Sequence, residues 1–140
     1  MTDTLDDLHA RAALDRLDAN VALTVFDGAV PNPFPGLPFV LVYTDIRWPA
    51  GEEGIGNALD HDSVSCRTTW YIHCVAATAA ACRALSMQVR EALLDFAPTI
   101  SGRNCTRLTM DDAQPPSKDE MTGTTVFDAV VVYSMTSVPG

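Results

Sequence analysis

The cysteines and histidines of this 140-residue chain are the side chains best suited to bind a transition metal, and their spacing argues against such a site. The best metal candidate is the set Cys66, His73 and Cys74, within the run CRTTWYIHC. Strand side chains alternate between two faces, so His73 and Cys74 would point in opposite directions. The sequence contains no Cys-x-x-Cys and no His-x-x-x-His spacing. We therefore expect no metal site.

A nucleophilic site would need a serine or cysteine beside a histidine. The histidines lie in three different segments, at His9, His61 and His73. Ser65 or Cys66 could meet a histidine and a loop aspartate only through the fold, since no nucleophile-elbow signature surrounds them. We expect that the chain is not an enzyme, and keep a small hydrolase using Ser65, His73 and loop aspartates as a minor alternative.

Two further patterns argue against a bound cofactor or cation. The glycines at 51, 54 and 56 are not followed by the Lys-Ser/Thr pair of a phosphate-binding loop. Asp60 and Asp62 lack the glycine and the distal glutamate of a calcium loop. We expect no cofactor.

The cysteines and the N-terminus bear on the compartment. Cys66, Cys74 and Cys82 sit in periodic segments where a small apolar side chain suffices, which favours reduced thiols over disulfides. The first 19 residues lack a basic start and a signal-type apolar core. No apolar run approaches the roughly 20 residues that span a bilayer. We expect synthesis inside the cell and no membrane contact.

The region from Cys66 to Phe96 shows which elements must position these residues. It begins with a strand pattern whose more apolar face predicts burial of Cys66, Thr68, Trp70, Ile72 and Cys74. A helix over residues 77–96 follows, with a stripe at helical spacing of Ala81, Cys82, Leu85, Val89, Ala92, Leu93 and Phe96. The pattern predicts a helix packed by one face on a sheet.

The rest of the chain completes an α+β domain over residues 1–140. Thr4 can cap a first helix with a buried side of Leu5, Leu8, Ala12, Ala13 and Leu17. We expect that helix at 5–19, further strands at 21–27, 39–44, 105–110 and 124–135, irregular chain at 28–38, long polar loops at 45–63 and 111–122, and a loose tail at 136–140. The expected order is α-β-β-β-α-β-β, a mostly antiparallel sheet covered by two helices.

The chain is acidic, with a formal net charge of −9. The excess is concentrated in residues 1–20, 45–63 and 111–122. Such a surface does not neutralise phosphates, which disfavours tight nucleic-acid binding. It serves solubility, or it repels a polyanion or meets a basic partner.

With this order of elements, the chain resembles the tail terminator (tail completion) proteins of long-tailed bacteriophages, most closely those of actinobacterial phages. The likeness covers most of the chain and consists in the order of the elements, their spacing and the character of their sequences. The runs that carry it are residues 23–45 (LTVFDGAVPNPFPGLPFVLVYTD), 70–95 (WYIHCVAATAAACRALSMQVREALLD), 114–120 (QPPSKDE) and 127–137 (FDAVVVYSMTS).

The resemblance implies a structural protein of the virion, made in the host bacterial cytoplasm. Such proteins form a homohexameric ring at the head-proximal end of the tail tube, where they end tube polymerisation. The implied partners are the tail tube protein and the head-tail connector or stopper protein, and packaged DNA passes through the lumen without specific binding. The resemblance implies neither enzymatic activity nor a cofactor.

The long polar loops at 45–63 and 111–122 should reach the neighbouring subunit or the adjacent ring. The candidate contact residues are Trp48, Glu52, Glu53, Asp60, Asp62, Asp111, Asp112, Lys118, Asp119 and Glu120. The alternative within the same class is another component of the phage neck, either a head-tail stopper or a tail tube subunit. A tube subunit would be richer in strands than this pattern of two helices.

Overall fold

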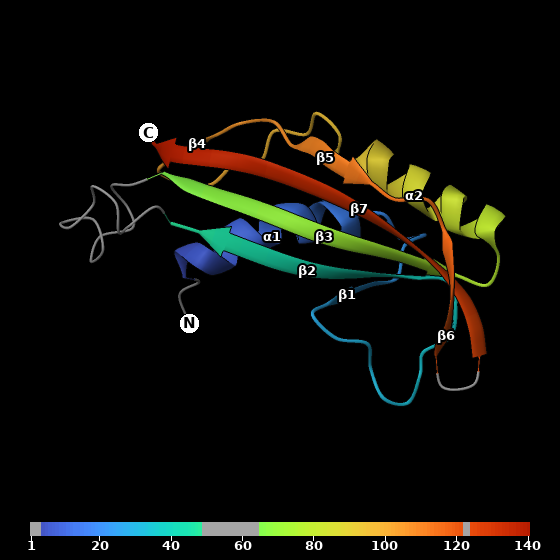
Figure 1. Ribbon diagram of the computed structural model, residues 1–140. Coiled ribbons are helices and arrows are strands. Elements are labelled where there is room, and N and C mark those ends of the chain that lie inside the picture. The colour runs from blue at the N-terminus through green and yellow to red at the C-terminus, as the bar shows by residue number, and fades with distance from the viewer. Residues whose placement is uncertain (1–3, 49–64, 122–123) are drawn as a thin grey trace.

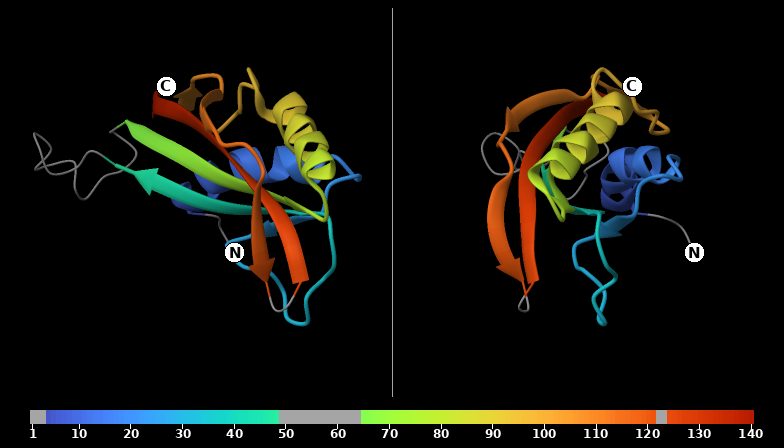
Figure 2. Two further views of the ribbon diagram at one scale, coloured as in Figure 1. Left: turned by 45° about the vertical axis from the view of Figure 1, so that its right-hand side comes forward. Right: turned by 90° about the vertical axis from the view of Figure 1, so that its right-hand side faces the viewer.

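The computed structural model describes residues 4–48, 65–121 and 124–140, in which both helices lie on one face of a twisted sheet (Figures 1 and 2). The elements are α1 (Leu5–Asp18), β1 (Val25–Asp27), β2 (Phe39–Arg47), β3 (Cys66–Ala76), α2 (Ala79–Leu93), β4 (Arg103–Cys105), β5 (Thr109–Ala113), β6 (Ser117–Met121) and β7 (Thr124–Pro139). The expected α+β class and order are confirmed, with three short strands preceding β7 where one was expected.

The sheet is organised around the long strand β7. Its order is β1-β2-β3-β7-β4, and β5 and β6 also pair with β7. Only β1 and β2 run parallel among the described strands; every other pairing is antiparallel. The mostly antiparallel sheet is therefore confirmed.

The main core lies between the helices and the sheet. A threonine caps each helix, Thr4 accepting from the Asp7 N–H and Thr78 from the Ala81 N–H. The predicted face of β3 is buried, and its Trp70 indole donates to the Ala10 carbonyl at 3.0 Å. This bond ties α1 to β3, while α2 buries Cys82, Leu85, Val89 and Leu93.

The segment at residues 28–38 covers part of the opposite face of the sheet. Phe39, Val75 and Val126 form a small buried cluster there. The Phe34 ring meets the Phe39 ring edge-on, with centroids 5.8 Å apart. This segment contains no helix or strand, as its prolines and glycines predict.

The prediction of a loop at residues 111–122 is wrong over most of that range. Residues 111–113 belong to β5 and residues 117–121 to β6, both paired with β7. The side chains of β5 are all exposed, so this edge strand carries no apolar alternation that would mark it in the sequence. Of the other expected loop, Asp45–Arg47 ends β2, and residues 49–63 lie outside the described part of the chain.

Two expected boundaries also differ. The strand expected at 21–27 begins only at Val25, because the Asn20 side chain accepts from the Ala22 N–H and forms a turn. Val21, expected to begin that strand, lies outside it and is 99% exposed. The expected tail at 136–140 continues β7, since alternate residues up to Ser137 stay buried and β4 pairs with its end.

Candidate functional site

The sulfur and imidazole groups of β3 do not converge. Cys66 and Cys74 are buried in the helix-covered face, whereas His73 is half-buried on the opposite face. Within residues 4–48, 65–121 and 124–140, no three His, Cys, Asp or Glu side chains could hold a metal ion. In the same residues, no helix is long and apolar enough to cross a bilayer.

The cysteines are free thiols in surroundings that oppose ionisation. Burial raises the pKa of Cys74 to about 12, and burial also raises the pKa of Cys66, Cys82 and Cys105. The Cys82 thiol donates to the Cys74 carbonyl oxygen at 2.9 Å. These thiols pack the core and are poor nucleophiles.

We predict that the folded protein reacts with Ellman's reagent at pH 8 at least about 100-fold more slowly than the same protein in guanidinium chloride. The denatured chain should release four equivalents, one for each cysteine. The measurement is the time course of thionitrobenzoate absorbance. Rapid release of one or more equivalents from the folded protein would show an activated thiol and contradict this assignment.

The hydrolase alternative fails on distance. Cys66 and His73 are seven residues apart along the single extended strand β3, or about 23 Å. Ser65 immediately precedes Cys66, so neither nucleophile can reach His73. What His73 contacts instead is Asp128 on β7, its Nδ1 lying 2.9 Å from Oδ2, with the Tyr43 ring edge-on beside it.

The His73–Asp128 pair makes stability depend on pH. The hydrogen bond to Asp128 raises the pKa of His73 above its ordinary 6.5, so the fold favours the protonated imidazole. The stabilisation is fully present below pH 6.5 and is lost as pH rises through the higher pKa of the folded state. We predict that Asp128→Asn lowers the free energy of unfolding by about 1 kcal/mol more at pH 5.5 than at pH 9.

Urea unfolding at both pH values measures this difference. Asp27→Asn is the matched control, since Asp27 is an exposed carboxylate on β1, and it should show no such pH dependence. An Asp128→Asn effect of equal size at the two pH values would contradict the pairing.

A second polar cluster was not predicted from the sequence. His9 of α1 is fully buried, and its Nε2 lies 2.7 Å from the Ser137 hydroxyl of β7. The Arg103 guanidinium donates to that hydroxyl at 3.0 Å and lies over the Trp48 ring. The Trp48 indole donates to Asp6 at 2.8 Å. The available signal was the i, i+4 spacing that places His9 between Leu5 and Ala13 on the buried side of the helix.

This cluster is structural, although it contains a serine hydroxyl beside an imidazole. The His9 Nδ1–H donates to the Leu5 carbonyl, which leaves Nε2 to accept from Ser137. Burial lowers the pKa of His9, which keeps the ring neutral. Ser137 is completely buried, so no substrate could reach its hydroxyl. The cluster fastens α1 to the end of β7.

The structure separates the candidate contact residues into three groups. Trp48 is half-buried within its own subunit in the cluster just described. Glu52, Glu53, Asp60 and Asp62 lie outside the described residues. Exposed positions on β5 and β6 hold Asp111, Asp112, Lys118, Asp119 and Glu120, with Asp111 3.3 Å from Arg67.

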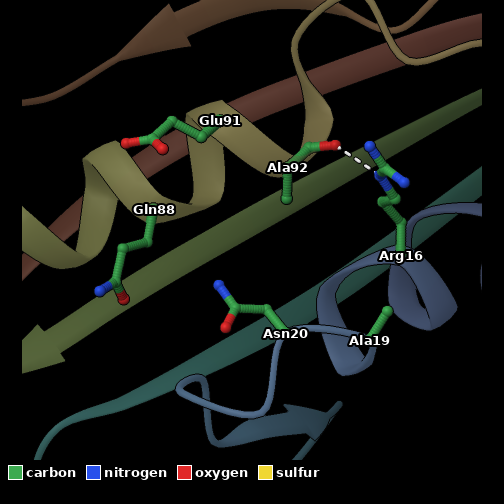
Figure 3. Close-up of a pocket in the computed structure, with 6 residues that line it drawn as sticks. All are labelled: Arg16, Ala19, Asn20, Gln88, Glu91 and Ala92. Carbon is green, nitrogen blue, oxygen red and sulfur yellow. Dashed lines mark hydrogen bonds between the residues drawn. The ribbon is translucent and has the colours of Figure 1, made fainter.

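Surface hollows lie on two sides of α2. The first lies between the C-terminal turns of α1 and α2, where Arg16 donates to the Ala92 carbonyl across it (Figure 3). The Arg16 guanidinium also lies over the Phe96 ring. The second is a groove of about 450 Å³ between α2 and β5. We call it the α2–β5 groove; it is lined by Arg83, Ser86, Met87, Arg90, Met110, Ala113, Gln114, Pro115, Pro116, Ala129, Val131 and Tyr133.

Comparison with known proteins gives a match at the level of structure. No protein-family model matches the sequence, and no curated protein matches it. Among the solved structures, the fold matches a chain described as part of the virion of a native gene transfer agent (GTA) particle. The TM-score is 0.65 at 18% sequence identity, and the match covers 93% of this chain and 94% of that chain. The two chains share a fold over nearly their full lengths.

Proposed function

We propose that this chain is a structural protein of a virion that forms a ring at the head-proximal end of a phage tail tube. There it ends tube polymerisation and provides the joint to the head-side connector. The observation that carries the proposal is the chain-long likeness to a protein of a GTA virion. The resemblance of the sequence runs to tail terminator proteins supports the position within the particle.

The chemistry of the described residues agrees with an assembly role. On β3, the thiols of Cys66 and Cys74 are buried and the His73 imidazole is paired with the Asp128 carboxylate. The described side chains of β5 and β6 are exposed, at one edge of the sheet. A packed core with an exposed sheet edge suits a subunit whose partners are other proteins.

We propose six copies in the ring. Identical subunits joined head to tail form either a closed ring or an open filament, and a cap must close. The acidic surface is suited to a channel through which DNA passes, because carboxylates repel phosphate. In that arrangement the DNA is a passing cargo and not a bound ligand.

Mass measurement under native conditions, for the chain alone and with tail tube protein of the same particle, tests this function. Six copies of the 15.0 kDa chain give a ring of roughly 90 kDa that binds tube ends. A head-tail stopper would bind the connector but not the tube, and a tube subunit would lengthen the tube. Either outcome would overturn the proposal in favour of that neck component.

A further inference from the structure

We propose that the α2–β5 groove of one subunit receives the α1–β1 corner, residues 18–22, of a second copy of this chain. Val21 enters the groove, and Asp18 faces the arginines on its rim. This inference depends on the proposed function at one point: the repeated contact is taken to close into a ring. The contact itself concerns two copies of the chain.

The groove is a largely apolar site on the surface of the subunit. Its walls carry two exposed methionines, Met87 on α2 and Met110 on β5, which are 51% and 37% exposed. Methionine side chains are flexible and adapt to the shape of an inserted apolar group. In its floor Tyr133 is completely buried, and its hydroxyl has no hydrogen-bond partner among the described residues.

The rim of the groove is cationic in a chain of net charge −9. Arg83 and Arg90 project from α2, and among the described residues neither guanidinium makes a hydrogen bond or ion pair. Arg90 is close enough to Tyr133 to affect its titration, although burial dominates and raises the pKa of that hydroxyl. A docking segment that carries an acidic side chain beside an apolar one therefore matches both the positive charge of the rim and the apolar walls of the groove.

The α1–β1 corner presents that combination. Val21 is 99% exposed, the highest value among the large exposed hydrophobic residues of the described chain, and Asp18 one turn earlier is also exposed. The corner is rigid, because the Ala22 N–H donates to the Asn20 side chain and the Leu23 N–H to its carbonyl, both at 3.0 Å. A preformed corner loses little conformational entropy on docking.

The two surfaces lie on opposite flanks of the helix layer (Figure 2, right). The corner is on the side of α1, which packs over β1 and β2, whereas the groove lies at β7 and β5 beyond α2. A surface and its complement at opposite edges cannot satisfy each other within a twofold dimer. They produce a head-to-tail contact that repeats around a ring.

A mixing experiment with two disabled chains tests the contact. The first carries Asp18→Arg and Val21→Arg and has an intact groove; the second carries Met87→Glu and Arg90→Glu and has an intact corner. All four side chains are exposed, so both chains should fold. We expect each alone to self-associate at least about 100-fold more weakly than the natural chain, since like charges now face each other.

Mixed together, the two chains retain one working corner and one working groove. We therefore expect a 1:1 pair of roughly 30 kDa in sedimentation equilibrium, with no larger species, because the pair has no second working contact. Asp27→Arg and Ala84→Glu are matched charge controls on β1 and on α2, and should self-associate like the natural chain. Absence of the pair, or full assembly of either disabled chain alone, would overturn the inference.

The same variants can show whether this inference or the proposed function is wrong. Disabled chains that still cap tail tubes as sixfold rings would disprove the contact and leave the function standing. A mixed pair from chains whose natural parent never binds tube ends would establish the contact and remove the function. A groove that captures tail tube protein, but not a second copy, would also disprove the contact.

Discussion

Changing Asp111, Asp112, Asp119 and Glu120 together to lysine should slow DNA ejection from assembled particles by at least about tenfold at low salt. The substitution changes the net charge of each chain from −9 to −1 and places lysines on the exposed strands β5 and β6. If these strands face the channel, the lysines will hold passing phosphates. The delay should shrink at high salt, because ions screen that attraction.

The matched control changes the same four residues to asparagine and glutamine, which removes repulsion without adding attraction. It should eject DNA faster than the lysine variant. If the lysine variant behaves normally, the acids of α1 that lie outside the proposed subunit contact (Asp6, Asp7 and Asp15) and then those of residues 52–62 should be reversed in turn. Normal ejection after reversal of every cluster, in particles that assemble normally, would place the acids on the outside of the ring.

Cells that assemble the particle without this chain should produce tail tubes of uncontrolled length that are not joined to heads. A tube without its terminal ring retains an open end to which further subunits add. We expect a broad length distribution with many tubes at least about twice the normal length. Negative-stain electron microscopy of lysates measures both the lengths and the fraction of joined tails.

Supplying the natural chain, or the Ala84→Glu control, should restore uniform joined tails. The defect also separates this function from its neighbours in the neck. Loss of a stopper leaves tails of normal length without heads, and loss of a tube subunit leaves no tube. Tails of normal length joined to heads in the absence of the chain would contradict a terminating role.

The central strand and helix could be predicted because their periodicities are strong. The alternation from Cys66 to Cys74 and the stripe from Cys82 to Leu93 both face a thick core, so burial dominates the choice of residue. The opposition of His73 and Cys74 followed from the same alternation. That opposition argues against a metal site made of Cys66, His73 and Cys74.

The edge strands could not be predicted in this way. The side chains of β5 face solvent, and backbone pairing with β7 rather than apolar burial holds the strand in place. Val21 was misplaced because a local Asn20 turn overrode an apolar alternation. The α2–β5 groove joins residues more than twenty positions apart, and a single sequence does not show which of these approach each other.

A reconstruction of the intact particle tests the central claim most directly. We predict six copies of this chain in one closed ring between the last tail tube ring and the head-side connector. Within it, the α1–β1 corner of each subunit should rest against α2 of the next. A different number of copies at that position, or density for this chain along the tube wall or within the head, would contradict the account.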